Sequence, residues 1–223
     1  VPKSAALHHV LGGAHVARRE AEPAEAAYLK ALELNPNLAA TYVALGQLYF
    51  TSGKYSQALA RLQDGLKVNP KDLAAQMLSG VIYERVGDIP KARQAYERAL
   101  EVNSRLALAA NNLAYLHSEH SGDQERALQL AQTAKEIAPN DPSISDTLGW
   151  ILYKRGVYQR ALGLLKESAT KLPENPEVQY HLGMASYRAG DKETARKALT
   201  TAATSPASFR GKEEAQKTLA DIR

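Results

Sequence analysis

Cysteine is absent from the 223-residue chain, and its absence removes several classes of chemistry. Without a thiol the chain has no disulfide framework, no cysteine nucleophile and no zinc-thiolate site. Long hydrophobic runs are missing too. The longest stretch free of charge, residues 34–53, contains Asn35, Pro36, Asn37 and Gln47, so it predicts a loop followed by a core helix. We therefore expect no direct membrane span.

An excess of one charge sign is also missing. The chain has 28 Lys and Arg against 24 Asp and Glu, and the two signs are interspersed with no like-charge run longer than Arg18–Arg19 or Glu213–Glu214. Proteins that follow a phosphate backbone concentrate their basic residues on one face. A nucleic acid partner is therefore not expected.

What the sequence contains is a repeat. Its small residues are spaced 34, 34, 34, 35 and 34 apart, at Gly12, Gly46, Gly80, Ala114, Gly149 and Gly183. A second series keeps step with it, at Ala24, Ala58, Ala92, Ala127, Ala161 and Ala195. A period in this range indicates stacked supersecondary units, each unable to bury its apolar face alone. An alanine- and leucine-rich chain with almost no β-branched runs predicts that these units are helical.

Each repeat predicts two helices. Around Gly46 the apolar stripe of the first helix is Tyr42, Leu45 and Tyr49. Glycines seven residues further on predict turns, at Gly53, Gly87, Gly156 and Gly190. The second helix carries its own stripe, illustrated by Ala58, Leu62 and Gly65. New helices are expected after the N-cap residues Asp72, Asp141 and Asn175.

This skeleton resembles the tetratricopeptide repeat, as in Leu45-Gly46, Tyr49, Gly53, Ala58, Leu62 and Pro70. The resemblance implies an all-α fold, a right-handed α-solenoid of six helix pairs whose first helices line a concave groove. The six repeats are expected within residues 1–209, at 5–38, 39–72, 73–106, 107–141, 142–175 and 176–209. Residues 210–223 are expected to form a capping helix, because Ala215, Leu219 and Ile222 share one helical face.

The fourth repeat departs from the pattern. It has Ala114 in place of glycine, and one extra residue lies between Ala114 and Ala127. We expect this insertion in the turn at residues 117–123. The pentatricopeptide RNA-binding repeat is the nearest confusable family, but its 35-residue period and its lack of this glycine, alanine and proline skeleton fit poorly.

No enzyme chemistry is indicated. The chain shows no Ser-His-Asp grouping, phosphate-binding glycine loop or carboxylate pair in a recognisable catalytic context. His117 and His120, with Glu119 between them, lack a third metal ligand at a known spacing. Catalytic residues, a metal site and a cofactor are therefore not expected.

The register predicts which side chains line the groove. In the first two repeats these positions are mostly small and apolar, whereas in the last three they are aromatic and polar. We expect a protein or peptide partner to bind at Asn111, Asn112, Tyr115, Asp146, Trp150, Tyr153, Lys154, Tyr180, His181, Met184, Tyr187 and Arg188. Two interpretations of Trp150 stay open: a recognition anchor, or a residue that packs against the neighbouring first helix and stiffens the stack.

The function that this pattern favours is a non-catalytic scaffold. The alternative is a substrate-recruiting or regulatory domain of a larger enzyme. Residues 107–223 also resemble bacterial tetratricopeptide proteins of exopolysaccharide export and exosortase systems, which implies a periplasmic or envelope setting. No signal peptide is visible, and a chain that opens at Val1 suggests a fragment or a processed form. The sequence does not indicate an oligomeric state.

Overall fold

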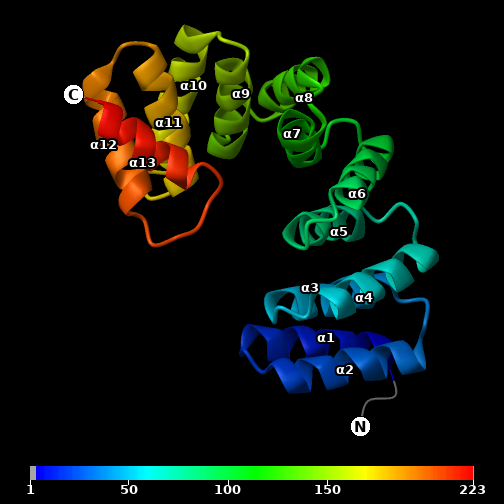
Figure 1. The fold of residues 1–223 in the computed structure, drawn as a ribbon. Helices are drawn as coiled ribbons and strands as arrows, with labels where there is room; N and C mark the ends of the chain where they lie inside the picture. Colours follow the sequence, from blue (N-terminus) through cyan, green and yellow to red (C-terminus); the bar gives the residue numbers. More distant parts are fainter. Residues whose placement is uncertain (1–3, 223) are drawn as a thin grey trace. The chain divides into compact units, whose positions relative to one another are not determined.

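The computed structural model describes residues 4–222, which form thirteen α-helices and no strand (Figure 1). The all-α solenoid predicted from the repeat is confirmed: twelve of these helices form six hairpins. The hairpins are α1 (Ala5–Ala17) with α2 (Ala21–Leu34), α3 (Ala39–Thr51) with α4 (Tyr55–Val68), α5 (Leu73–Arg85) with α6 (Ile89–Val102), α7 (Ala107–Leu116) with α8 (Gln124–Ile137), α9 (Pro142–Lys154) with α10 (Tyr158–Lys171), and α11 (Pro176–Arg188) with α12 (Lys192–Thr204). The last helix, α13 (Lys212–Asp221), packs on α12 and α11.

The chain divides into two compact units. Unit 1 extends to Ser104 and unit 2 begins at Arg105. Within each unit the second helix of one hairpin packs against the first helix of the next, as α2 does on α3 in unit 1 and α10 on α11 in unit 2.

Helix starts and turns follow from local side-chain chemistry. The carboxylates of Asp72 and Asp141 accept hydrogen bonds from backbone N–H groups in the first turn of α5 and of α9, and the side-chain oxygen of Asn175 does the same for α11. The predicted turn glycines adopt positive φ, for example 72° at Gly53. In the turn of the first hairpin Arg19 adopts the positive φ, at 61°. It is the only residue other than glycine with a positive φ among residues 4–222.

The small-residue series lies where the two helices of a hairpin meet. A Cβ added to Gly46 would stand 2.8 Å from Leu62, and one added to Gly80 would stand 2.4 Å from the ring of Tyr96. Each large partner comes sixteen residues after its glycine. In the fourth repeat the equivalent positions are Ala114 and Ala131, both fully buried, so a gain in size on one helix accompanies a loss on the other.

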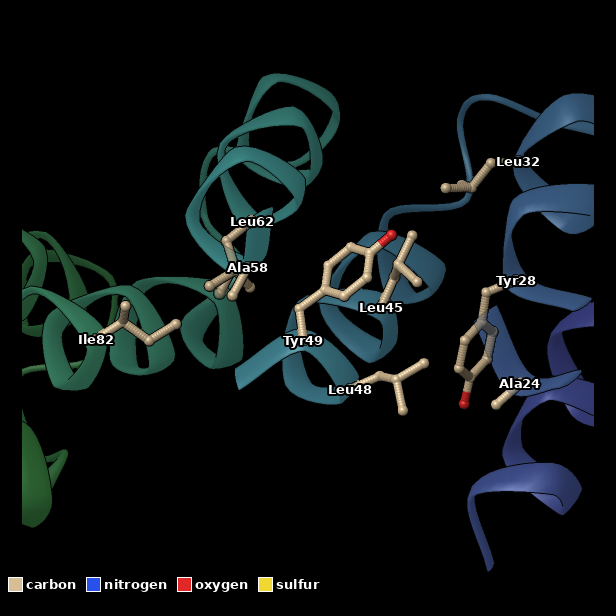
Figure 2. Close-up of a cluster of buried hydrophobic side chains, with 10 residues drawn as sticks. Ala24, Tyr28, Leu32, Leu45, Leu48, Tyr49, Ala58, Leu62 and Ile82 are labelled. Atoms are coloured by element: carbon tan, nitrogen blue, oxygen red, sulfur yellow. The ribbon is translucent and has the colours of Figure 1, made fainter. Parts of the chain in front are cut away.

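The core of unit 1 forms between successive helices. Side chains of α3 lie between those of α2 and α4 (Figure 2). The labelled members of this cluster are Ala24, Tyr28, Leu32, Leu45, Leu48, Tyr49, Ala58, Leu62 and Ile82.

One face of α1 is uncovered. Leu7 and Leu11 are 56% and 41% exposed, whereas Thr41 and Leu45, at the same register positions in α3, are fully buried. The positions on α3 are covered because α2 packs there. Among residues 4–222, no helix covers α1 in the equivalent way.

The extra residue of the fourth repeat lies in the predicted turn. Residues His117–Ser121 form a π-helical turn, η1, which ends at Gly122 with φ 70°. A π-helical turn takes up one additional residue without breaking the helix that leads into it. The insertion therefore extends the C-terminal end of α7 and carries Ser118 and Glu119 with it.

Candidate functional site

The expected groove residues all belong to unit 2, on the first helices α7, α9 and α11. Neighbouring first helices touch: α7 contacts α9, and α9 contacts α11. Side chains of one helix can therefore reach those of the next. The Nδ1 atom of His181 on α11, for example, lies 2.9 Å from Oδ2 of Asp146 on α9.

Trp150 is enclosed by rings and only 8% exposed. Its ring stacks on Tyr153 at a centroid distance of 4.7 Å and on His181 at 4.1 Å, with interplanar angles of 9° and 18°. Two rings stacked so closely do not fit on one face of the indole, so Trp150 lies between Tyr153 and His181. The Tyr180 ring contacts the same indole in a tilted orientation, at a centroid distance of 5.3 Å.

Glu119, the middle residue of the π-helical turn, accepts most of the polar contacts of this region. Its side chain is only 5% exposed, and Oε1 accepts hydrogen bonds from Trp150 Nε1 at 3.1 Å and from the Lys154 ammonium. Oε2 lies 3.1 Å from Nη1 of Arg210. Two cations and an indole N–H thus satisfy this buried carboxylate, as a buried charge requires.

The segment before α13 contacts the same aromatic side chains. A Cβ on Gly211, which has φ 96°, would stand 2.4 Å from the ring of Tyr180, so only glycine fits there. The Tyr180 hydroxyl donates a hydrogen bond of 2.6 Å to Glu214 on α13. Burial first, and then this bond, raises the pKa of Tyr180. The C-terminal segment is therefore fixed against α11 by complementary polar and steric contacts.

These groups enclose a pocket of about 240 Å³, which we call the Trp150 pocket. It is lined by Tyr115, Glu119, Trp150, Lys154, Glu177, Tyr180, His181, Arg210, Gly211 and Glu214. Half of this set was expected from the register. Glu119 and Glu177 occupy groove positions but were not among the expected site residues, and Arg210, Gly211 and Glu214 follow the end of the repeat pattern, where no register predicts their place.

The remaining expected residues do not line this pocket. Met184 is buried in the core of unit 2, and Tyr187 packs partly buried against it. Burial raises the pKa of Tyr153, while a side-chain hydrogen bond with Arg188 opposes that shift. Asn111 is buried on α7 beside the half-buried Asn112.

Glu177 differs from the other pocket carboxylates. Its backbone N–H donates a hydrogen bond to the side-chain oxygen of Asn175. Its carboxylate has no hydrogen-bond donor among residues 4–222. Burial raises the pKa of this carboxyl above its ordinary value, and the nearby charges of Asp146 and Glu119 raise it further, whereas His181 and Arg210 lower it. Of the three pocket carboxylates, Glu177 is therefore the one that no donor among residues 4–222 contacts.

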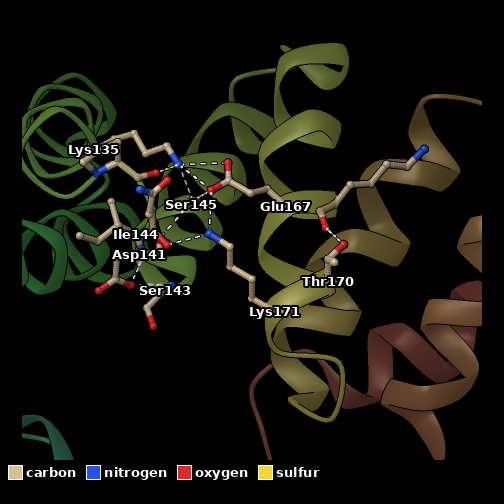
Figure 3. Close-up of polar contacts among 11 residues, drawn as sticks. Lys135, Asp141, Ser143, Ile144, Ser145, Glu167, Thr170 and Lys171 are labelled. Atoms are coloured by element: carbon tan, nitrogen blue, oxygen red, sulfur yellow. Dashed lines mark hydrogen bonds and ion pairs between the residues drawn. The ribbon is translucent and has the colours of Figure 1, made fainter.

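A second polar cluster of unit 2 lies at the loop before α9 and is satisfied internally (Figure 3). The Lys135 ammonium donates to Pro139 O at 2.6 Å, to Ser145 Oγ at 2.6 Å and to Glu167 Oε1 at 3.0 Å. Lys171 donates to Asn140 O at 2.8 Å. Since each charged group of this cluster has partners, it holds α8, α9 and α10 together.

The structure also bears on metal and membrane contacts. Within residues 4–222, no three histidine or acidic side chains lie close enough to hold a metal ion. His117 is buried, and its Nδ1 atom lies 3.1 Å from Ser121 Oγ. In the same range, no helix has the length and apolarity needed to cross a bilayer.

Family profiles described as tetratricopeptide repeat match residues 5–38, 43–103, 82–142 and 152–208. The chain belongs to the tetratricopeptide repeat family. The comparison with curated proteins gives no match.

Solved structures share the tetratricopeptide fold at low sequence identity. The pilF protein of Pseudomonas aeruginosa superposes with a TM-score of 0.79 at 18% identity, over 96% of this chain and 97% of that one. PilW, described as a type IV pilus biogenesis factor, gives 0.68 at 20% identity, over 82% and 87%. YrrB, described as a tetratricopeptide protein with an unusual peptide-binding site, gives 0.64 at 21% identity, over 85% and 97%.

Proposed function

We propose that this tetratricopeptide chain is a non-catalytic scaffold that binds a protein or peptide segment on the face formed by α7, α9 and α11. The observation that carries the proposal is the Trp150 pocket, where aromatic walls and charged groups from those three helices converge. Concave sites with apolar walls and a few placed polar groups are the usual form of a binding site. The peptide-binding site named for YrrB supports this use of the fold.

The proposed segment binds at the expected residues that the structure leaves accessible. Trp150, Tyr180, His181 and Met184 are buried, so they shape the face and hold its rings in place. Tyr115, Asn112, Asp146, Tyr153 and Tyr187 are half-buried and can contact a ligand, together with Lys154 and the exposed Arg188. Asn111 is buried, and its side-chain amide donates a hydrogen bond of 3.5 Å to Asn112.

We place this scaffold in a bacterial envelope assembly. The similarity to PilW, named as a pilus biogenesis factor, supports that setting. The resemblance of residues 107–223 to tetratricopeptide proteins of exopolysaccharide export points the same way.

A peptide-display selection with the full chain tests the proposal. Peptides that bind should lose affinity about tenfold or more for Tyr115→Ala, because a half-buried aromatic in a pocket is the kind of residue that anchors a ligand. Gln47→Ala is the matched control, since Gln47 holds the same register position in α3 of unit 1. Failure to select any peptide, or equal losses for the two variants, would contradict the proposed site.

A further inference from the structure

The Trp150 pocket has more negative than positive charge to satisfy. Its lining includes the carboxylates Glu119, Glu177 and Glu214 and the cations Lys154 and Arg210. Lys154 and Arg210 both bind Glu119. The carboxylate of Glu214 accepts the Tyr180 hydroxyl. Glu214 and Glu177 therefore both lack a cationic partner among residues 4–222, and Glu177 is the one of the two that has no hydrogen-bond donor either.

The surroundings of Glu177 penalise a bare carboxylate. Burial is the largest cause that disfavours its charged form, and the carboxylates of Asp146 and Glu119 act in the same direction, whereas His181 and Arg210 partly oppose them. An anionic ligand, such as a peptide C-terminus, would add to this repulsion because both fixed cations already bind Glu119. A ligand that brings positive charge and N–H donors would relieve it.

The pocket already holds one ammonium group by the same chemistry. Lys154 Nζ lies 5.8 Å from the centroid of the Trp150 ring while it binds the Glu119 carboxylate. An aromatic face beside a carboxylate is a favourable environment for a cation. Glu177 offers a second carboxylate in the same pocket, which the Tyr180 ring also lines, and no protein ammonium binds it among the described residues.

The volume sets the size of the ligand group. At about 240 Å³ the pocket is smaller than sites for drug-sized molecules, which span roughly 300–1,000 Å³. It suits a single side chain. We infer that the Trp150 pocket binds the ammonium or guanidinium group of a lysine or arginine side chain, with Glu177 as the counter-charge. The inference rests on the proposed function, because the partner segment supplies that side chain.

The test uses a probe that needs no identified partner. Nα-acetyl-lysine methylamide is titrated into the full chain, and the single indole N–H signal of Trp150 is followed by NMR, since the chain has one tryptophan. Nα-acetyl-norleucine methylamide, which lacks the ammonium, is the matched probe. We expect a saturable shift with the lysine probe and none with norleucine.

Glu177→Gln should weaken the lysine probe about tenfold or more, because it removes the charge and keeps the shape. Glu193→Gln, an exposed change on α12 outside this pocket, should leave the affinity unchanged. The inference is overturned by equal shifts from the two probes, by no saturable shift from the lysine probe, or by unchanged affinity in Glu177→Gln.

The two proposals fail in different ways. If display yields peptides whose lysine or arginine can be replaced by norleucine without loss, the cation site is wrong and the peptide scaffold stands. If the lysine probe binds as expected but no peptide is selected, the pocket recognises a free amine and the proposed function is wrong.

Discussion

The indole nitrogen of Trp150 donates a hydrogen bond of 3.1 Å to Glu119, and this bond joins α9 to the one turn of the chain that carries an extra residue. The link depends on the insertion, because the π-helical turn is what extends α7 as far as Glu119. Such turns occur often at functional sites. Here the irregular turn supplies the carboxylate on which Lys154 and Arg210 converge.

Trp150→Ala should destabilise unit 2. The ring is buried, stacked on two neighbours and hydrogen-bonded, so its removal is expected to cost about 3–5 kcal/mol. Trp150→Phe keeps a ring in the stack and should cost less. Urea unfolding followed by circular dichroism measures both, and equal stability of Trp150→Ala and the parent chain would show that the stack is not structural.

Gly46→Leu should overpack the contact between α3 and α4. A Cβ there already meets Leu62 at 2.8 Å, so the expected cost is about 1–3 kcal/mol. The control is Gly163→Ala, because a Cβ at Gly163 meets no atom within 4 Å in the middle of α10. That variant should gain about 0.5–1 kcal/mol from helix propensity. Unchanged stability of Gly46→Leu would contradict the packing role of Gly46.

These contacts show how far sequence reasoning reaches. The regular spacing of Gly46 and Gly80 marks where the two helices of a hairpin touch, because a close approach needs a small residue at a fixed register. The N-caps Asp72, Asp141 and Asn175 were predictable because a cap acts within its own helix turn.

The candidate site was only partly predictable. Register places Trp150 on a face but does not show that His181 and Tyr153 cover its ring, since that depends on side-chain packing between helices. Arg210 and Glu214 gave no signal because the repeat ends before them. An isolated glycine ahead of a helix, Gly211, was the one local sign that the backbone approaches another group there.

Arg19→Gly should stabilise unit 1. Arg19 holds the positive φ that glycine holds in the other described hairpins, and an L-residue in that conformation costs roughly 1–2 kcal/mol. A gain of up to about 1 kcal/mol is expected after the added freedom of the unfolded chain is counted. The reciprocal change, Gly53→Arg, should lower the melting temperature. A loss in Arg19→Gly would mean that the Arg19 side chain stabilises the turn.

Leu45→Ala should lose much more stability than Leu11→Ala, although the two residues hold the same register position. Leu45 is fully buried and its truncation should cost about 2–5 kcal/mol, whereas Leu11 is 41% exposed and should cost less than about 1 kcal/mol. The urea midpoints of the two variants and of the parent chain, measured in parallel, give the two losses. Similar losses would show that α1 is covered in solution.

Two carboxylates should give opposite dependences of stability on pH. Burial raises the pKa of Glu177, so its contribution to folding is lost as the pH rises from about 4.5 through the raised value. Glu177→Gln should therefore melt higher than the parent at pH 7 and match it near pH 4. No change in this difference between the two pH values would contradict the pKa shift.

Glu167 is the control for that measurement. Burial alone would raise its pKa, but hydrogen bonds from Lys135 and Ser145 outweigh burial and hold the pKa below its ordinary value. The Glu167 carboxylate therefore stabilises the folded state at pH values above its pKa in the unfolded chain, and this stabilisation is lost as the pH falls. Glu167→Gln should melt lower than the parent at pH 7, and the difference should shrink in acid.

Because Leu7 and Leu11 on α1 are exposed, a further helix pair can be fused before α1 more easily than after α12. A consensus helix pair fused in register ahead of Ala5 would place its second helix on Leu7 and Leu11, and no contact among residues 4–222 would have to be broken. The same graft after α12 would first have to displace α13 and with it the Glu214 contact to Tyr180. Repeats can therefore be added before α1 without changing the Trp150 pocket, whereas repeats added after α12 would disrupt it.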